Sequence, residues 1–245
     1  MKKIITISVL ILIVILVING CKKDNNSPNP YNGKSTAVFN SSVTYGTLTD
    51  QDGNIYKTVT IGTQTWMAEN LRTTKYRDGS AISNVTNDIA WQILTTGAYC
   101  NYNNTESVDT IATNGRLYNW YAATDSRNIA PTGWHVPTDA EWTTLITYLG
   151  GDSVAGGKMK EIGTTHWASP NTGATNESGF SAVPVGSRIG YSGEFSSLVY
   201  GDDYWSSTQS EASSAWNCSL FSDYTYCRLW AYDKTFGSAV RLVKD

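Results

Sequence analysis

The sequence is poor in the residues that most enzymes use for catalysis. It has two histidines, His135 and His166, and four cysteines among 245 residues. It contains no H-E-x-x-H zinc motif, no paired C-x-x-C and no phosphate-binding glycine loop. The stretch 190–194 lacks the spacing of a nucleophile elbow. No nucleophile motif stands beside either histidine, so we predict no catalytic residues and no cofactor.

Positive charge is scarce as well. The chain has 18 basic and 21 acidic residues, a formal net charge of −3, and no basic stripe. This excludes nucleic acid as an expected partner, because nothing would neutralise the phosphates. Leucine-rich helical patterns are also rare, whereas 21 glycines, nine tryptophans and fifteen tyrosines are present. The composition favours an α+β domain with short strands and many loops over a helical bundle.

The one long hydrophobic run is at the N-terminus. Residues 4–18 are almost all Ile, Leu and Val and follow two lysines. This length is typical of a signal peptide and is short for a membrane span, which needs ~20 residues. The run ends in Ile-Asn-Gly-Cys, which resembles a bacterial lipobox, although Asn19 is larger than the usual residue. We predict a signal peptide over 1–20 and lipidation of Cys21; an uncleaved anchor helix is the alternative.

Lipid on Cys21 would hold the protein at a membrane. Lys22 follows the cysteine, and by analogy with lipoprotein sorting this favours the outer membrane or cell surface. Residues 21–46 are polar and interrupted by prolines, so we expect the lipidated cysteine to be followed by a flexible tether. The remaining residues, 47–245, are expected to form the globular domain.

Several segments predict secondary structure. The β-branched and aromatic run 55–61 predicts a strand, and helical spacing of apolar residues predicts helices over 115–123 and 138–149. The second helix has a capping box, formed by Thr138 and Glu141. Short strands are expected in the C-terminal third at 204–208, 215–220, 225–230 and 238–243.

The two middle strands of this group predict a hairpin. If residues 221–224 form its loop, Cys218 lies directly opposite Cys227. Opposed Cα atoms are ~4.5–5.5 Å apart, which is within disulfide range, so we predict a Cys218–Cys227 bridge. A register shifted by one residue would instead place the two thiols on opposite faces. Cys100 is then the unpaired thiol.

Five sequence blocks resemble the Fibrobacter succinogenes major paralogous domain family, and together they span roughly residues 50–245. The Pro-Thr-Gly-Trp-His-Val-Pro block is the most specific of them. Proteins of this family are often exported and lipid-anchored. The blocks are residues 59–72, 115–122, 131–142, 204–208 and 239–245.

The resemblance implies an architecture similar to C-type lectins and formylglycine-generating enzymes. It implies a C-type-lectin-like α+β domain with short antiparallel strands, two main helices and long loops, in which N- and C-terminal strands pair. Family members often carry cysteines where this chain has Ala130 and Leu242. Packing of these two apolar residues would replace any bridge between them.

Aromatic residues provide the candidate ligand-binding groups. Rings on loops offer rigid contact area with a polar end and can stack on sugars. Four tryptophans, at positions 66, 134, 142 and 205, are instead expected in the core. The candidates, which lie in or beside the C-terminal loops, are Tyr200, Tyr204, Tyr224, Trp230 and Tyr232.

The motifs of calcium-dependent lectins, Glu-Pro-Asn, Gln-Pro-Asp and Trp-Asn-Asp, are missing. Asp202, Asp203 and Asp223 could supply oxygen ligands, but acidic loop residues are usually just solvated, and we predict no metal site.

The sequence therefore favours a non-catalytic, lipid-anchored envelope protein that binds a glycan or a surface protein. One alternative is an oxidase-like enzyme related to formylglycine-generating enzymes, which needs a reactive cysteine pair. The other is a structural envelope or matrix component.

Overall fold

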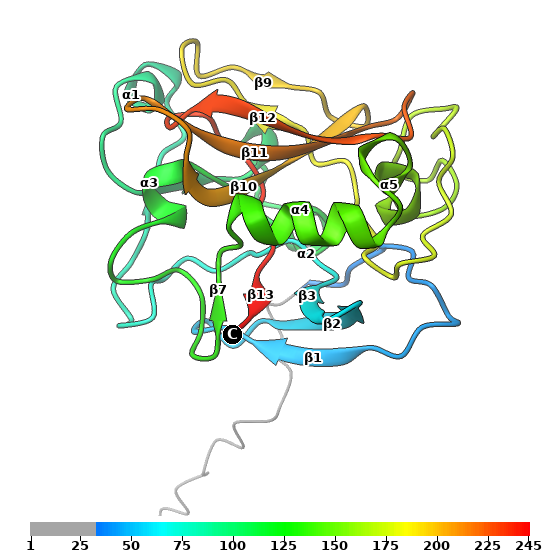
Figure 1. Cartoon of the computed structure of the whole chain (residues 1–245). Coiled ribbons are helices and arrows are strands. Elements are labelled where there is room, and N and C mark those ends of the chain that lie inside the picture. Colours follow the sequence, from blue (N-terminus) through cyan, green and yellow to red (C-terminus); the bar gives the residue numbers. More distant parts are fainter. Residues whose placement is uncertain (1–32) are drawn as a thin grey trace, which may run out of the picture.

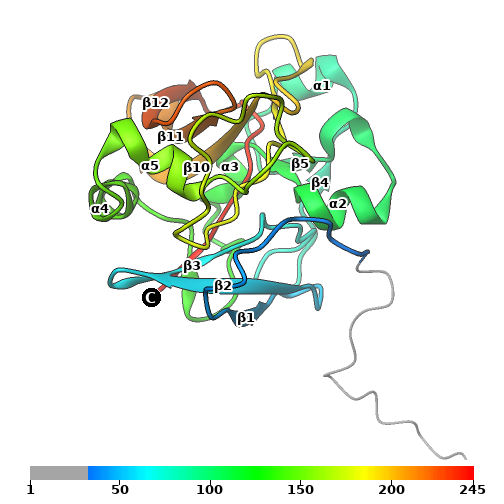
Figure 2. The same ribbon diagram turned by 90° about the vertical axis from the view of Figure 1, so that its right-hand side faces the viewer.

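The computed structural model describes residues 33–245. The predicted signal peptide, Cys21 and the first part of the predicted tether lie outside these residues. The described part is mixed α+β, with five α-helices and four small sheets (Figures 1 and 2). None of the helices in this part is both long enough and apolar enough to cross a membrane.

The first sheet joins the two ends of the domain. Its strand order is β1-β2-β3-β13-β7, and every neighbouring pair is antiparallel. The last strand of the chain thus lies beside an early one, as expected, at the bottom of Figure 1. The strands are β1 (Gly46–Thr49), β2 (Ile55–Ile61), β3 (Gln64–Met67), β7 (Trp134–His135) and β13 (Val243–Lys244). The strand predicted at 55–61 is confirmed.

The second sheet has the order β10-β11-β12, also antiparallel. Helix α4 lies along one face of it, and the β8–β9 hairpin lies on the other side (Figure 1). The elements are β10 (Gly201–Gln209), β11 (Ser214–Phe221), β12 (Cys227–Asp233), α4 (Asp139–Tyr148), α5 (Asp152–Met159), β8 (Ser187–Arg188) and β9 (Phe195–Ser196).

The remaining elements cover one flank of the molecule, where α1 and α2 lie side by side with β4 and β5 (Figure 2). A parallel pair, β4 with β5, and an antiparallel pair, β5 with β6, form the small sheet there. These elements are β4 (Ser83–Asn84), α1 (Asp88–Gln92), β5 (Ala98–Cys100), a 3-10 turn (Tyr102–Asn104), α2 (Val108–Asn114), β6 (Leu117–Tyr118) and α3 (Trp120–Ala123).

Helix α4 confirms the prediction from its capping box. The Thr138 hydroxyl accepts from the Glu141 backbone N–H, and the Glu141 carboxylate accepts from the Thr138 N–H. Such a box satisfies two N–H groups that a helix start leaves unpaired. After the helix, Gly150 and Gly151 adopt φ of 101° and 96°, which only glycine adopts at little cost.

Aromatic rings fill the space between α4 and the first and second sheets. The Trp66 and Trp142 ring centroids are 4.6 Å apart, and Trp142 lies 5.7 Å from Tyr204. Phe180 packs against all three rings. Trp134 and Trp205 are also buried, so the four tryptophans assigned to the core are confirmed.

The helix predicted at 115–123 is wrong in its first half. Leu117 and Tyr118 form a strand, β6, and the helix begins only at Trp120. The cause is Asn119, whose side-chain oxygen accepts from Ala122 N–H and also from Ala98 N–H of β5. Asparagine is a strong N-cap residue, so it starts a helix after itself and keeps the preceding residues extended.

The predicted hairpin exists with a different register. Leu220 pairs with Cys227, and Cys218 pairs with Leu229, so the predicted strand 225–230 is shifted and its loop is longer. The Lys160 ammonium explains the longer loop, because it donates to the carbonyl oxygens of Phe221 and Tyr224 at 2.8 Å each. The predicted register is therefore corrected: Cys218 and Cys227 are not directly opposed but are diagonal neighbours, and their side chains contact each other as free thiols.

Two other boundaries differ from the predictions. The predicted strand 238–243 is a strand only at its end, in β13, although Ser238 and Ala239 form isolated bridges. The predicted tether also ends earlier than residue 46. Residues 33–45, here called the strap, pack on the domain through Phe39, Val43 and Tyr45. Aromatic and β-branched residues therefore fix this segment despite its polar composition.

Candidate functional site

A polar and aromatic pocket of about 390 Å³ opens on the face of the second sheet away from α4. We call it the Asp203 pocket, and its principal lining residues are Ser187, Tyr191, Ser197, Asp203, Tyr232 and Phe236. Strand alternation places Asp203 there, because its neighbour Tyr204 points to the other face and packs on Trp142. The pocket thus has strands β10 and β12 on one side and the β8–β9 hairpin on the other.

Asp203 is the buried carboxylate of this pocket, and the exposed Asp233 also lines it. Its side chain is buried, and the residue is 6% exposed. The Ser219 hydroxyl donates to its Oδ1 at 2.5 Å. Burial raises the pKa of Asp203 to about 6, against the opposing effect of hydrogen bonds from Ser219 and Ser187. The carboxylate is therefore ionised above that pH and can accept hydrogen bonds from a ligand.

Aromatic rings form the walls of the Asp203 pocket. The rings of Tyr232 and Phe236 are stacked, with centroids 4.6 Å apart and planes 13° apart. Burial raises the pKa of Tyr232 to about 12, so its hydroxyl keeps its proton and remains a donor. Tyr191, in the loop of the β8–β9 hairpin, is 78% exposed. Two rings are thus fixed and a third is open to a ligand.

Arg188 holds the hairpin that carries Tyr191. Its guanidinium is fully buried, and its Nε donates to the Gly193 carbonyl at 2.7 Å. Its Nη2 pairs with Asp88 at 2.7 Å. Forked donation of this kind fixes geometry at several points, so the loop wall of the pocket is anchored to α1.

The predicted ligand-binding residues have separate locations. Tyr232 lines the Asp203 pocket, whereas Tyr204 is a correction: it is fully buried in the core against Trp142. Its strand position, not a loop position, explains this burial. Tyr200, Tyr224 and Trp230 are exposed. Tyr224 stacks on Tyr226 in the β11–β12 loop, and Trp230 borders a smaller hollow beside α4.

The aspartates considered for calcium also have separate locations. Asp202 and Asp203 are consecutive in β10 and point to opposite faces. Asp202 is fully buried near Arg241, and burial raises its pKa well above the ordinary value. Asp223 lies in the β11–β12 loop. Within residues 33–245, no group of three or more His, Cys, Asp or Glu is arranged to hold a metal ion.

The thiols are poor nucleophiles in this environment. Cys100, Cys218 and Cys227 are all buried. Burial raises the pKa of Cys100 to about 12 and that of Cys218 well above its ordinary value. Because the thiolate is the reactive form, none of these positions favours the oxidase-like alternative.

His135 connects three parts of the first sheet and its surroundings through both ring nitrogens. Its Nδ1 lies 2.6 Å from Asp245 Oδ1, and its Nε2 lies 2.8 Å from Glu141 Oε1. Partial burial opposes the protonated form, but the hydrogen bonds to Asp245 and Glu141 raise the pKa of His135 above its ordinary value. Both ring nitrogens are occupied, and the residue connects β7 to α4 and to the C-terminus.

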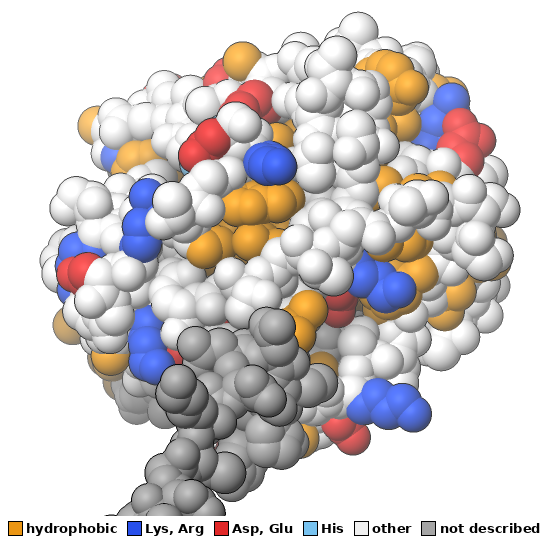
Figure 3. Space-filling model, turned by 90° about the horizontal axis from the view of Figure 1, so that it is seen from below, with side chains coloured by type: hydrophobic (Ala, Val, Ile, Leu, Met, Phe, Trp, Pro, Cys, Tyr) orange, Lys and Arg blue, Asp and Glu red, His pale blue; other side chains and the backbone are white. Residues whose placement is uncertain are grey.

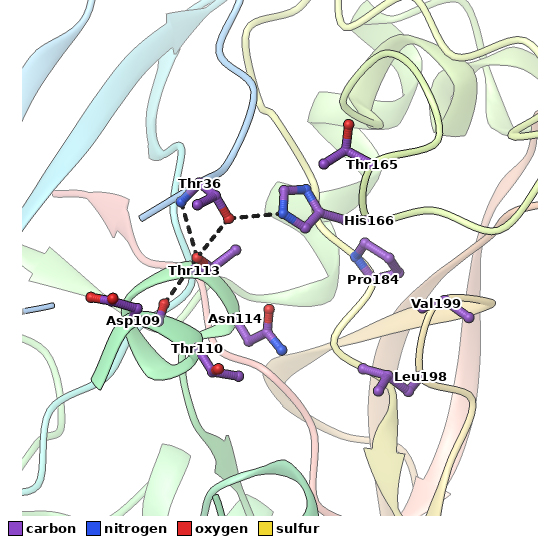
Figure 4. Close-up of a pocket in the computed structure, with 10 residues that line it drawn as sticks. All are labelled: Thr36, Asp109, Thr110, Thr113, Asn114, Thr165, His166, Pro184, Leu198 and Val199. Carbon is purple, nitrogen blue, oxygen red and sulfur yellow. Dashed lines mark hydrogen bonds between the residues drawn. The ribbon is translucent and has the colours of Figure 1, made fainter. Parts of the chain in front are cut away.

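His166 was missed by sequence reasoning. It lines a second pocket of about 390 Å³, the His166 pocket, together with Thr36, Thr113 and Asn114 (Figure 4). Its Nε2 lies 3.0 Å from the Thr36 hydroxyl, and its Nδ1 lies 2.5 Å from Glu161. Thr36 is 130 residues away along the chain and was assigned to the tether. No local motif therefore signalled this contact.

The surface view from below shows hydrophobic side chains gathered in a hollow near the middle of that face (Figure 3). The Lys and Arg side chains around it are scattered and interspersed with acidic ones. Where residues 33–245 are visible on this face, their basic side chains form no continuous stripe of the kind that binds nucleic acid (Figure 3).

Comparison with models of known protein families identifies the family of this chain. The model of the Fibrobacter succinogenes major domain matches residues 59–244. No curated protein and no solved structure matches the chain.

Proposed function

This chain belongs to the Fibrobacter succinogenes major domain family, and from this premise we propose that it is an exported envelope protein whose domain binds a carbohydrate in the Asp203 pocket. In this proposal, lipid on Cys21 anchors the protein at the outer membrane or cell surface. The hydrophobic run 4–18 and the lipobox-like end of that run support the anchor.

The observation that carries the proposal is the combination of a buried carboxylate with open aromatic rings in one concave site. Asp203 accepts hydrogen bonds, and three serines at the pocket supply further hydroxyl groups. Tyr191 and the Tyr232–Phe236 stack present ring faces and edges. Sugars need both kinds of contact, because they have hydroxyl groups around the ring and apolar C–H faces.

The fold is consistent with a lectin-like binding domain. In the proposed C-type-lectin-like architecture, N- and C-terminal strands pair and the following segments form long loops. The placement of β13 between β3 and β7 supports this, as does the long irregular stretch between α5 and β8. The oxidase-like alternative has less support, because Cys218 and Cys227 are fully buried.

The first prediction concerns Tyr191. Replacement Tyr191→Ala should weaken binding of the preferred glycan by about two- to tenfold, since an aromatic contact contributes about 0.5–1.5 kcal/mol. The matched control is Tyr148→Ala, because Tyr148 is also exposed but lies on α4, outside the pocket. The measurement is titration calorimetry of the purified full-length protein with ligands found on a polysaccharide panel.

Two results would contradict the proposal. Equal loss in the Tyr191→Ala and Tyr148→Ala proteins would mean that the pocket is not the binding site. Absence of binding to every polysaccharide by the folded protein would favour the structural alternative, an envelope or matrix component.

A further inference from the structure

Three side chains at the His166 pocket have the connectivity of a nucleophile, a base and an orienting acid. The Thr36 hydroxyl is 3.0 Å from His166 Nε2, and His166 Nδ1 is 2.5 Å from Glu161 Oε1. One ring nitrogen of the imidazole contacts the hydroxyl, and a carboxylate holds the other ring nitrogen. This arrangement activates hydroxyl nucleophiles. It is recognised by geometry and role rather than by order along the chain.

Exposure decreases along the same three residues. Thr36 is exposed, the His166 side chain is 17% exposed and the Glu161 side chain is 1% exposed. The other Glu161 oxygen, Oε2, accepts from the Val38 N–H at 2.9 Å, which fixes the carboxylate. The nucleophile therefore faces the cavity while the acid is held in the interior, where its contact with the imidazole is shielded from water.

The strap is fixed so that the Thr36 hydroxyl stays at His166. The Thr36 N–H donates to the Thr113 hydroxyl at 3.0 Å, and Thr113 in turn donates to the Asp109 carbonyl at 3.0 Å (Figure 4). The Lys34 N–H donates to Asp109 Oδ1 at 2.7 Å. Helix α2 thus positions the nucleophile from one side and His166 contacts it from the other.

The cavity beside these groups has a polar wall and an apolar wall. Asn114 and Thr110 belong to α2, and Pro184, Leu198 and Val199 lie across from them (Figure 4). Val199 has φ of 65°. A β-branched residue in this region is strained, and such strain is concentrated at functional sites.

We propose that the His166 pocket hydrolyses carboxylic esters with a small acyl group, using Thr36 as nucleophile, His166 as general base and acid, and Glu161 as the positioning residue. The apolar wall of Pro184, Leu198 and Val199 receives the acyl group. The Asn114 amide, in the same pocket, is the side-chain donor for the oxygen that becomes negative.

The reaction has two steps. In the first, Thr36 Oγ1 attacks the ester carbonyl carbon while its proton moves to His166 Nε2; the bond to the alcohol oxygen then breaks, and that oxygen takes the proton. An acyl-Thr36 ester remains. In the second step, water attacks this ester and gives a proton to His166, which returns it to Thr36 as the carboxylic acid leaves. Water is the only co-reactant, and no electrons are transferred.

The test is hydrolysis of p-nitrophenyl acetate by the purified full-length protein, with peptide mass mapping of the acetyl adduct. The wild-type protein should turn over the ester and carry the adduct on Thr36. Thr36→Val and His166→Gln should each lower the rate by about 10²-fold or more, the usual contribution of a nucleophile or base. Thr36→Ser keeps the hydroxyl and should retain activity.

Controls separate catalysis from folding. Thr63→Ala removes an exposed hydroxyl in the β2–β3 turn and should leave the rate unchanged. Thermal unfolding shows whether Thr36→Val remains folded, and Thr36→Ser supplies an active variant if it does not. The proposal is overturned if folded wild-type protein does not hydrolyse the ester, if the adduct maps to another residue, or if Thr36→Val reacts at the wild-type rate.

Discussion

At the residue scale, two residues of the blocks that resemble the family, Asn70 and Arg241, serve the core. The fully buried Arg241 guanidinium donates to Asn70 Oδ1 at 2.7 Å and to the Ser181 carbonyl at 3.1 Å. It also contacts the Phe180 carbonyl. A buried charge needs such partners to offset its lost hydration. Asn70 and Arg241, which belong to the first and last resemblance blocks, therefore act as one structural unit.

A prediction at this scale concerns the contribution of His135 to stability and its dependence on pH. The folded pKa of His135 is raised, so its contribution to stability is full below its unfolded pKa, ~6.5, and is lost as pH rises through the folded value. Glu141 has a lowered pKa, against the effect of burial, because of hydrogen bonds from Thr138 and His135; its contribution is lost as pH falls. The ion pair of His135 with Glu141 therefore stabilises the protein most at about pH 5.5–6.5, between the ordinary pKa values of glutamate and histidine.

His135→Gln should therefore destabilise the protein by about 0.5 kcal/mol near pH 6, as expected for a partly exposed pair, and by less at pH 9. Urea unfolding at both pH values measures this, with Thr63→Ala as a control that should follow the wild type. A penalty that is larger at pH 9 than at pH 6 would refute the role assigned to the imidazolium.

Single residues also show what sequence patterns can and cannot predict. Trp66 and Trp142 were assigned correctly to the core, because a large ring in a patterned strand or helix is usually buried. Tyr204 was assigned wrongly, because its place one residue after Asp203 decides which face it occupies. The Asp203 carboxylate and the Thr36–His166–Glu161 contacts depend on tertiary packing, which no local spacing encodes.

At the scale of elements, local chemistry predicted α4 and the presence of the β11–β12 hairpin, but not the register of that hairpin. Thr138 and Glu141 specify the start of α4 within four residues. The hairpin register instead depends on Lys160, which is distant in sequence and donates to carbonyls in its loop. A prediction that assumes a four-residue loop over 221–224 therefore gives the wrong partner for each cysteine.

The strap gives a prediction at this scale. A chain that starts at residue 47 lacks the packing of Phe39, Val43 and Tyr45 on the core. Removing these partly buried side chains should cost about 4 kcal/mol and lower the melting temperature by roughly 10 °C for a domain of this size. Thermal unfolding of chains starting at residues 33 and 47 measures the difference. Equal melting temperatures would show that the strap is only a tether.

At the scale of the whole molecule, the family and the mixed α+β class were accessible from sequence, because several motifs in one order specify them. The relation between the two pockets was not accessible. Ser197 lines the Asp203 pocket, and the next two residues, Leu198 and Val199, line the His166 pocket. One short segment therefore forms a wall of both pockets, so a ligand in the first pocket would lie beside a wall of the second.

The most direct test of the proposed binding function is calorimetric titration of the best panel glycan into wild-type and Asp203→Asn protein at pH 7.5 and pH 5. Burial raises the pKa of Asp203 to about 6, so its carboxylate is charged at the first pH and protonated at the second. Loss of a hydrogen bond to a charged group costs about 1.5–3 kcal/mol. Wild-type affinity should therefore fall by up to about tenfold at pH 5, where about a tenth of the carboxylates remain charged, while Asp203→Asn binds weakly at both. Equal affinity of the two proteins at pH 7.5 would contradict the proposal.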